Sequence, residues 1–512
     1  MPTPPQRLAS DRSDHLRFGP LLVLCLTFFL IALDNTIVVV AIPSLAQALS
    51  ASTSALQWIT DAYTTTFAAM IIIGGYTADR RGRRPTLIFA LVLFFFGSLI
   101  ATVASTVGVV IAGRAVMGIG AAFAIPSSLS MLVDIFHSGT QRETAIAGWT
   151  ASAGVGVAAG PLVGGVLLDH FWWGSIFLAS GAVALAVLVA ALIFLPSNTP
   201  TRVGGFDFVG SVLTLGSLLA LVSAIIEAPT WGWTSLRFAG LVLVAIVFAG
   251  VLAVRERRSQ EGILRLDLIK VRTFSIPSLA MGIVYFVIFG YLFLATQYLQ
   301  EILGESPLNA GLHVLPAAAA VVVGSGISRA LGAKVQARYL YALGLTSLAL
   351  ACGIMHSLSP TSGYGNIFVT LIGGGLAMGI VLTRGTESVM GTLAIRDTGI
   401  GAGINVSVME IGGAFGVAVF GTLFNETFRS YGHQHFTTLP PNAIVLATRS
   451  LAAALGVLAR FANAHGAGAL LSGVHRAFTD GFTTAAYAGI TICIVGIVTV
   501  VIALRSSRTQ QA

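Results

Sequence analysis

The chain is built from apolar runs of about 20 residues, separated by short polar connections. A helix of that length is what the hydrocarbon core of a bilayer requires. Only 9% of the 512 residues are charged and 55% are hydrophobic, whereas an ordinary soluble protein is about 25% charged. Too few charged groups remain to cover a soluble surface of this size. The pattern predicts an integral membrane protein and excludes a soluble enzyme, a disordered protein and a nucleic-acid-binding domain.

Fourteen runs are candidates for membrane-spanning helices. We expect them at residues 20–44, 55–76, 86–105, 108–132, 143–168, 174–195, 208–228, 237–254, 275–299, 309–331, 339–358, 364–390, 401–424 and 484–504. The run at 364–390 is the least regular, because it contains Arg384 and Glu387. The expected fold class is an all-α integral membrane protein with fourteen transmembrane helices.

Positive charge is distributed unevenly over the connections. If the runs alternate in direction, 21 of the 28 Lys and Arg residues fall on one side of the membrane and five on the other. Lys and Arg are retained on the cytoplasmic side, so both termini are expected in the cytoplasm. We therefore expect cytoplasmic tails at 1–19 and 505–512, a cytoplasmic linker at 255–273 and a long external loop at 425–483. Its weakly apolar stretch at 443–458 is compatible with an external helical hairpin.

A charged loop rich in glycine follows the second run. It reads Gly75-Tyr76-Thr77-Ala78-Asp79-Arg80-Arg81-Gly82-Arg83-Arg84. Glycines at either end permit a tight turn, and the Asp79 carboxylate stands next to four arginines. This chemistry suits a charge latch between cytoplasmic helix ends, which forms in one conformation and breaks in another. The alternative is an ordinary positively charged cytoplasmic loop.

Three further motifs lie within the runs. The first run contains Leu33-Asp34-Asn35-Thr36-Ile37-Val38-Val39-Val40-Ala41-Ile42-Pro43, and the fourth contains Arg114-Ala115-Val116-Met117-Gly118. The fifth run has small residues and one proline in a fixed pattern, namely Gly156, Gly160, Pro161, Gly164 and Gly165. The functional interpretation of the fifth run is a bendable, tightly packed helix, and the alternative is generic small-residue packing.

Together these motifs resemble the major facilitator superfamily. The loop at 75–84 is similar to the family signature G-x-L-A-D-R-x-G-R-R, with Thr77 as its departure. The fifth-run pattern resembles the antiporter motif of the family's exporters. The first-run motif is similar to L-D-x-T-I-V-N-V-A-L-P of fourteen-span drug:proton antiporters, with Val39 in place of Asn. The resemblance implies two six-helix halves at 20–195 and 275–504, two inserted spans at 208–254, and alternating access around a midplane site.

Within that subfamily, Trp58-Ile59-Thr60-Asp61-Ala62-Tyr63 most resembles exporters of quaternary ammonium compounds and cationic dyes. Those carry an acidic residue after a Trp in the second span, as this chain does at Asp61. An acidic position of that group in the tenth span has no counterpart here, since 309–331 contains no Asp or Glu. The particular drug is therefore not indicated.

Three carboxylates lie in apolar runs, at Asp34, Asp61 and Glu410. A charge near the bilayer centre costs about 2.5–3.5 kcal/mol on insertion scales, so such groups are functional candidates. At a rise of 1.5 Å per residue, Asp34 is roughly 21 Å and Glu410 roughly 15 Å into its run. We expect Asp34 and Glu410 to carry protons, and Asp61 and Asp34 to contact substrate. The alternatives are that Asp34 simply pairs with Arg114 and that Asp61 faces an outer aqueous vestibule.

Other side chains have supporting roles in this hypothesis. Arg114 is either a fixed partner of a carboxylate or modulates proton release from Asp34, and the family motif favours the second. Glu387 stands three residues after Arg384, so the two can pair on one helix face; a structural pair is favoured, and proton transfer by Glu387 is the alternative. Trp58 and Tyr63 accompany Asp61, and aromatic faces attract cations. Their alternative is ordinary packing.

No G-x-x-x-x-G-K-[ST] phosphate loop, metal-ligand cluster or catalytic constellation stands out in the chain. The sequence therefore predicts a transporter, not an enzyme, driven by the proton gradient without ATP, metal or another cofactor. We expect a monomeric exporter of lipophilic, cationic small molecules in the inner membrane of a bacterium, with no nucleic-acid partner. One alternative is an exporter of an endogenous metabolite, lipid or self-made antibiotic. Another is a non-transporting sensor or scaffold, which would not need intramembrane carboxylates.

Overall fold

The computed structural model describes residues 8–136, 139–196, 208–258, 268, 270–332, 334–359, 362–392, 398–437, 439–460 and 467–504. These residues form helices and their connections, and no strand occurs among them. The helices of the first part are α1 (Leu8–Ala48), α2 (Thr53–Arg81), α3 (Arg83–Thr102), α4 (Val107–Ile135), α5 (Gly139–His170), α6 (Ser175–Phe194), α7 (Phe208–Trp231) and α8 (Leu236–Arg258). Those of the second part are α10 (Arg272–Gln297), η1 (Tyr298–Ile302), α11 (Pro307–Gly332), α12 (Ala337–His356), α13 (Tyr364–Thr392), α14 (Thr398–His435), α15 (Pro441–Ala447), α16 (Leu451–Arg460) and α17 (Ala467–Ala503).

Within the described ranges, thirteen helices are long and apolar enough to cross a membrane. The prediction of an all-helical, multi-pass membrane protein is therefore confirmed. The helix at the second expected span, α2, has 29 residues but is not one of the thirteen. It carries Asp61 and several threonines, which make it less apolar than its neighbours. The total of fourteen spans stays a prediction.

Several helices extend beyond the expected span boundaries. The connection expected at 425–483 is largely helical, because α14 continues to His435 and α17 begins at Ala467, with α15 and α16 between them at the stretch considered for a helical hairpin. Its external position stays a prediction. With 38 residues, α14 is about 57 Å long, whereas the hydrocarbon core is about 30 Å thick. Its polar end therefore projects out of the apolar layer and remains helical.

The expected polar segments at the other end are also partly helical. The tail expected at 1–19 is helical from Leu8, where α1 begins, and its cytoplasmic location stays a prediction. The linker expected at 255–273 is helical at both ends. Its first residues belong to α8, which ends at Arg258, and its last belong to α10, which begins at Arg272. Residues 259–267 of that linker lie outside the described residues. Hydropathy marks the part of a helix that lies in lipid, but not the turns that continue into water.

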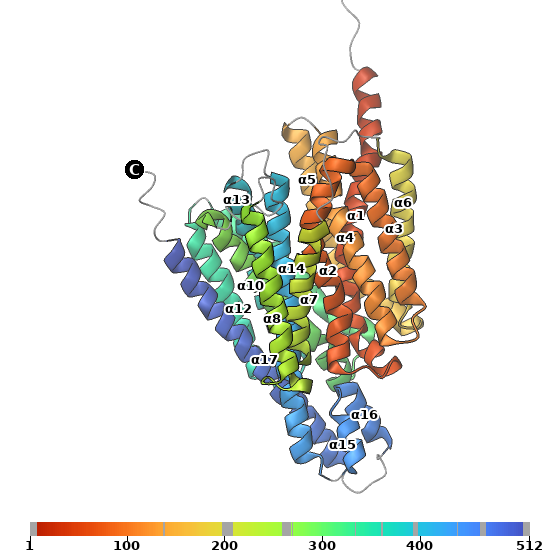
Figure 1. Ribbon diagram of the computed structural model, residues 1–512, viewed down its shortest axis with the longest axis vertical. Helices are drawn as coiled ribbons and strands as arrows, with labels where there is room; N and C mark the ends of the chain where they lie inside the picture. The colour runs from red at the N-terminus through yellow and green to blue at the C-terminus, as the bar shows by residue number, and fades with distance from the viewer. Residues whose placement is uncertain are drawn as a thin grey trace, which may run out of the picture.

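The same packing order occurs twice along the chain. In the first part α1 packs on α5, α2 on α4, and α3 on both α4 and α6. In the second part α10 packs on α14, α11 on α13, and α12 on both α13 and α17. Figure 1 shows these two groups side by side, with the start of α1 and the end of α17 toward the same end of the molecule. We refer to the two groups as the N-half (α1–α6) and the C-half (α10–α14 and α17).

The pair α7 and α8 lies outside this repeat. The two helices pack on each other, and α7 also packs on α2 and α14, one helix from each half. Only 6% of the most apolar window of α8 is buried inside the protein. The pair therefore covers one junction between the halves with α7 and presents α8 to lipid.

Hydrogen bonds between the halves gather at the end where α1 finishes. Gln300, in the π-helical turn η1, donates to the Val40 carbonyl oxygen at 2.8 Å, and Gln47 donates to Glu301 Oε1 at 2.9 Å. The amide of Thr53 donates to the Arg449 carbonyl oxygen at 3.1 Å, which ties the α15–α16 connection to α2. This end of the bundle is therefore closed by direct bonds between the halves.

Glycines of the fifth helix allow α5 and α1 to approach closely. A Cβ on Gly160 would overlap Thr36 Oγ1 and lie 2.9 Å from the Leu33 carbonyl oxygen. In a membrane, small residues at such contacts replace the hydrophobic effect as the basis of helix association, because lipid is as apolar as the helices.

We predict that Gly160→Ala destabilises the protein by about 1–3 kcal/mol, the usual cost of overpacking a tight contact. The matched control is Gly250→Ala on α8, where an added Cβ meets nothing within 4 Å. Thermal unfolding of the purified proteins in detergent measures the difference. Equal melting temperatures for the two variants would show that the α1–α5 approach is not tight.

Candidate functional site

A buried ion pair lies at the centre of the N-half. Arg114 Nη1 of α4 lies 2.6 Å from Asp34 Oδ2 of α1, and both side chains are at most 1% exposed. The Arg114 Nε donates to the Ile59 carbonyl oxygen of α2 at 3.2 Å. The guanidinium carbon lies 4.2 Å from the centre of the Tyr63 ring. One arginine therefore connects α4, α1 and α2, and the pairing of Asp34 with Arg114 considered from the sequence is formed.

The ion pair leaves hydrogen-bonding capacity unused. Asp34 Oδ1 is buried and has no partner among the described residues, and the same holds for the Tyr63 hydroxyl. An unsatisfied buried acceptor costs about 1–3 kcal/mol, and more for a charged group. A proton, a water molecule or a cationic substrate at this oxygen would remove that cost. The arrangement is therefore suited to binding one of them.

Asp61 lies apart from the Asp34–Arg114 ion pair, on a face of α2 other than that of Tyr63. Its side chain is fully buried, and within the described part of the chain neither carboxylate oxygen has a hydrogen-bond partner. One helical turn earlier, Gln57 donates to the Ala418 carbonyl oxygen of α14 at 2.8 Å, so this face of α2 is directed at the C-half. An ionised carboxylate without partners is far costlier to bury than a neutral one. This position therefore suits a carboxyl that binds a proton or a cation.

The two aromatic residues expected beside Asp61 point in different directions. Trp58 packs with Val222 and Ile226 of α7 and with Ala418 of α14. Tyr63 instead faces Arg114. Residues two apart on a helix differ by about 200° in direction, which explains why Asp61 and Tyr63 do not share a face. The assignment of Trp58, Asp61 and Tyr63 to substrate binding stays a prediction.

Glu410, a residue of the C-half, lies in the same region as Tyr63. Its side chain, on α14, is 5% exposed, and Glu410 Oε2 has no partner in the described residues. It lies close enough to the hydroxyls of Tyr63 and of Tyr285, on α10, to interact with both electrostatically. The hydroxyl of Tyr63 is also within electrostatic range of Asp34 and Arg114. Asp34, Arg114, Tyr63 and Glu410 therefore form one group, which we call the central cluster.

Two polar residues near these carboxylates were missed by the sequence analysis. Tyr285 of α10 lies within electrostatic range of Glu410 and stacks on Phe289, with ring centres 5.3 Å apart. Gln57 bonds across the halves to α14. A glutamine inside an apolar run is a signal that could have identified Gln57, since buried polar groups in membranes are seldom without a partner. No comparable signal marks Tyr285, because tyrosines are frequent in membrane helices.

Glu387 lies apart from the central cluster. It forms an ion pair with Arg384 at 2.9 Å, as expected from their spacing, and its side chain is 50% exposed. The pair lines a cavity of about 410 Å³ together with Thr273, Ser388, Gly391 and Thr392. Those residues stand at the beginning of α10 and the end of α13. The structural interpretation of this pair is therefore the better supported one.

The charged loop between α2 and α3 holds the N-half together. Gly82 has φ of +99° between the two helices, a conformation that only glycine adopts easily. Arg83 pairs with Asp134 and donates to the Ser130 carbonyl oxygen at 2.9 Å, both on α4. Arg84 donates to the Leu192 carbonyl oxygen of α6 at 2.8 Å.

The remaining residues of the motif are placed as follows. The guanidinium of Arg80 lies 4.1 Å from the Tyr76 ring centre, and a Cβ on Gly75 would lie 3.4 Å from Pro126. The side chain of Asp79 lies outside the described residues. In this conformation the described bonds of Arg83 and Arg84 stay within the N-half. The latch between helix ends stays a prediction.

The glycine motif of α5 contacts both halves. Gly156, Gly160 and Gly164 face α1, where added Cβ atoms would crowd Phe29, Leu33 and Ile37. Gly165 and Pro161 face α11, where they meet Leu308 and Gly311. The helix therefore stands at the junction between the halves.

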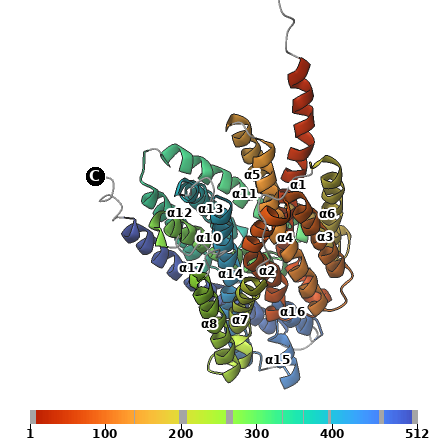
Figure 2. The same ribbon diagram turned by 45° about the horizontal axis from the view of Figure 1, so that its top comes forward.

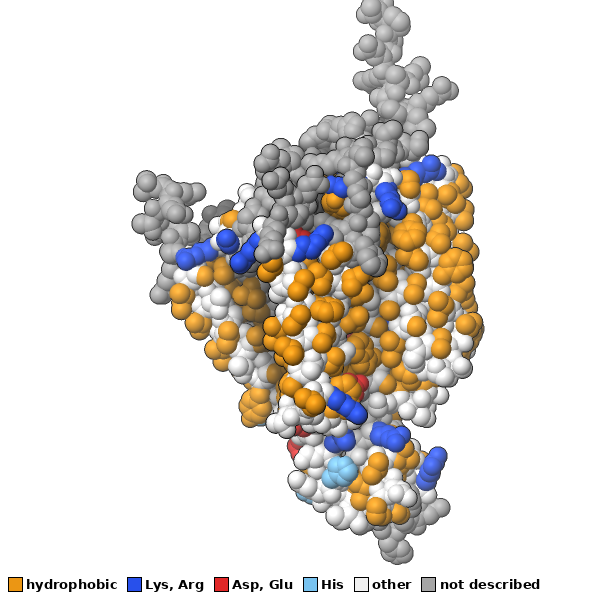
Figure 3. Space-filling view, viewed as in Figure 1, with side chains coloured by type: hydrophobic (Ala, Val, Ile, Leu, Met, Phe, Trp, Pro, Cys, Tyr) orange, Lys and Arg blue, Asp and Glu red, His pale blue; other side chains and the backbone are white. Residues whose placement is uncertain are grey.

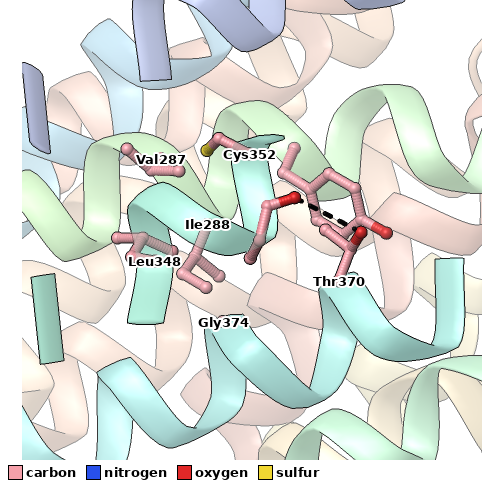
Figure 4. Close-up of a pocket in the computed structure, with 8 residues that line it drawn as sticks. Val287, Ile288, Leu348, Cys352, Thr370 and Gly374 are labelled. Carbon is pink, nitrogen blue, oxygen red and sulfur yellow. Dashed lines mark hydrogen bonds between the residues drawn. The ribbon is translucent and has the colours of Figure 1, made fainter. Parts of the chain in front are cut away.

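A small enclosed cavity lies inside the C-half, away from these groups. Figure 4 shows its lining, with Thr370 Oγ1 donating to the Ala351 carbonyl oxygen at 3.5 Å. The other lining residues are Val287, Ile288, Tyr291, Leu348, Cys352 and Gly374. Its volume of about 10 Å³ is that of about one water molecule. It is therefore a packing gap, too small for a drug-sized ligand.

A repeated helical architecture with buried carboxylates in both halves is the design of a secondary transporter. The family model for the Major Facilitator Superfamily matches residues 24–208. The tetracenomycin C resistance and export protein of Streptomyces glaucescens is 32% identical over 425 residues, which cover 82% of this chain and 78% of the relative. The multidrug efflux pump LfrA of Mycolicibacterium smegmatis is 31% identical, covering 82% and 84%. The chain therefore belongs to the Major Facilitator Superfamily, and by family and fold it is a transporter of small molecules.

Solved structures agree on the fold. A bacterial homolog of the human lysosomal transporter Spinster, in an inward-facing and unoccupied conformation, matches with a TM-score of 0.66 over 96% of this chain and 97% of that chain. The sequence identity is 17%. A peptide transporter in complex with sulfate matches with a TM-score of 0.63. At these identities the likeness concerns the fold alone.

We predict that Arg114→Met destabilises the protein by about 3–5 kcal/mol, because it leaves the Asp34 carboxylate buried without its partner. The double variant Asp34→Asn/Arg114→Met removes both charges and should recover most of that stability. Thermal unfolding in detergent measures both. If the double variant melts as low as the single one, the buried charge is not the cause of the loss.

Proposed function

We propose that this protein is a drug efflux transporter that exports lipophilic, cationic compounds in exchange for protons. The observation that carries the proposal is the set of three buried carboxylates with unsatisfied oxygens, Asp34 and Asp61 in the N-half and Glu410 in the C-half. The relatives support export, because their names describe multidrug efflux and antibiotic resistance. The motif around Asp61 supports cationic substrates.

Each carboxylate has a separate task in this mechanism. Asp61, without a cationic partner, binds the positive charge of the substrate when it is ionised. Asp34 and Glu410 accept protons that arrive from outside, and their neutralisation weakens substrate binding and favours its release. Arg114 competes with the proton for Asp34, so that proton release toward the cytoplasm is favourable again. One charge moved across 100 mV supplies about 2.3 kcal/mol, so no ATP or other cofactor is needed.

The proposed location is the inner membrane of a bacterium, with both chain termini in the cytoplasm and a monomer as the working unit. Figure 3 supports a transmembrane arrangement: hydrophobic side chains cover the middle of the visible face, and Lys and Arg lie toward its two ends. The excess of Lys and Arg in the loops on the terminal side supports the orientation.

A second candidate is an exporter of a self-made antibiotic or another metabolite. It is favoured by the printed functions of two relatives, tetracenomycin C export and cephamycin export. The fold and the carboxylates would serve both functions, and only the pocket contacts would differ.

Efflux of ethidium from energised cells tests the proposal. We expect wild-type cells to exclude the dye, and a protonophore to abolish the exclusion. For each net charge that the exchange moves inward, every 100 mV lost removes about 2.3 kcal/mol, which is about a 50-fold change in the dye gradient. Efflux that continues after collapse of the proton gradient would rule out proton antiport. If no cationic dye is moved, the metabolite exporter becomes the better proposal.

We further predict that Asp61→Asn raises the KM for ethidium about tenfold or more, since one charge contact of about 1.4 kcal/mol or more is lost. Asp61→Glu should retain part of the affinity because it keeps the charge. The control is Asp480→Asn, which removes an exposed carboxylate of α17 and should leave KM unchanged. An unchanged KM in Asp61→Asn would exclude Asp61 from the substrate site.

A further inference from the structure

A polar cavity lies in the C-half where α13 ends and α10 begins. Its volume is about 410 Å³, within the range of about 300–1,000 Å³ that is typical of small-molecule sites. Since α10 leads into η1, which bonds to the end of α1, the start of α10 lies at the end of the bundle where α1 begins. The lining is polar apart from one glycine and consists of Thr273, Arg384, Glu387, Ser388, Gly391 and Thr392.

Two side chains of this lining have hydrogen-bond donors that are not used. The Arg384 guanidinium has five N–H donors, and the bond from Nη1 to Glu387 is its one hydrogen bond among the described residues. Ser388 Oγ accepts a bond from the Tyr341 hydroxyl of α12 at 2.8 Å, so its own proton is left to donate. A planar guanidinium beside a hydroxyl donor suits the oxygens of a phosphate.

The charge around the cavity is positive. A Cβ on Gly332, at the end of α11, would lie 3.7 Å from Arg384 Nη1. Arg329 and Lys334 stand three residues before and two residues after Gly332, and both are exposed. Glu387 is the one carboxylate of the lining. Three cations near a single carboxylate favour an anionic ligand over a cationic one.

The lining of α13 is directed at lipid and away from the centre of the protein. Gly385 packs against Met281 of α10, and Glu387, two residues further on, points about 200° away from it. Val369 is 18 residues before Glu387, or five helical turns, and on this shared face its side chain is 47% exposed. On the neighbouring α12, two residues after the Tyr341 that bonds to Ser388, Leu343 is 46% exposed. Apolar side chains exposed on a membrane helix contact lipid chains.

We propose that this cavity binds the phosphate of an anionic phospholipid, held by Arg384 and Ser388, in the leaflet on the side where α1 begins. In the proposed orientation that is the cytoplasmic leaflet. Free phosphate offers the same oxygens, but the exposed apolar surface beside the cavity favours a phosphate that carries acyl chains. Figure 2 shows α11, α12 and α13 side by side with this end turned forward. A lipid bound here would connect the ends of these three helices.

Native mass spectrometry of the purified protein with added phosphatidylglycerol tests the site. We expect the wild type to retain the lipid and Arg384→Gln to bind it about tenfold more weakly, the loss typical of one charge-assisted contact. The matched control is Arg460→Gln, which removes an exposed arginine of α16 at the opposite end and should bind as the wild type does. Equal binding by Arg384→Gln and the wild type would overturn the proposal.

Glu387→Gln separates a lipid site from a purely structural ion pair. Both substitutions break the bond between Arg384 and Glu387, but only Arg384→Gln removes donors for a phosphate. We expect Glu387→Gln to bind phosphatidylglycerol at least as tightly as the wild type, because the repelling carboxylate is gone. If both variants lose binding to the same extent, the ion pair accounts for the loss and the lipid site is excluded.

The source of the phosphate is identified by comparing three ligands in thermal unfolding. We expect phosphatidylglycerol to raise the melting temperature of the wild type more than phosphatidylcholine or inorganic phosphate does, and Arg384→Gln to lose this difference. An equal rise with inorganic phosphate would show a soluble ligand and overturn the lipid assignment. An equal rise with phosphatidylcholine would show lipid binding without recognition of charge, which also contradicts the proposal. None of these measurements depends on transport, so the proposed function is tested separately.

Discussion

The cost of placing charge in a dry, apolar interior governs this structure. Asp34 and Arg114 are both almost fully buried, and the desolvation of two such ions is offset only by close pairing and further hydrogen bonds. Arg114 meets this requirement with contacts to α1 and to the Ile59 carbonyl and Tyr63 ring of α2. One guanidinium therefore connects α1, α2 and α4. The unpartnered oxygens at Asp34, Asp61 and Glu410 are the places where the requirement is not met.

Such dry surroundings depend on close helix packing, which glycine provides. Gly118 on α4 allows α2 to approach at Tyr63, one turn from Arg114, and Gly160 allows α5 to approach α1 at Leu33. Lipid offers no hydrophobic gain for helix association, so these contacts rely on shape and on backbone proximity. Glycines of the motifs that resemble those of the family therefore also keep the helices close around the Asp34–Arg114 pair. The same glycines therefore determine how closely the helices pack and keep the Asp34–Arg114 pair buried.

Most of the architecture was predictable from the sequence, because hydropathy reports directly on the part of a helix that lies in lipid. The pairing of Asp34 with Arg114 was also predictable, since two opposite charges in apolar runs have few other partners. The continuation of α14 to His435 was not, because polar helical turns beyond the membrane carry no apolar signal. The proximity of Glu410 to Tyr63 depends on how the two halves pack on each other. The hydrophobic periodicity of the sequence carries no information on that packing. Tyr63 and Asp61 point in different directions because residues two apart on a helix differ by about 200°, although they are close in the sequence.

The distribution of the carboxylates over the halves explains how movement can be coupled to protons. Asp34 and Asp61 belong to the N-half, whereas Glu410 belongs to the C-half and lies within electrostatic range of the Tyr63 hydroxyl. Rocking of one half against the other changes the distance between these groups and the amount of water around them. Because the cost of an ionised carboxylate depends steeply on both, the proton affinity of each site must change as the halves move. Movement of the halves therefore changes the proton affinity of the carboxylates directly, and no further residue is needed to couple proton binding to the movement.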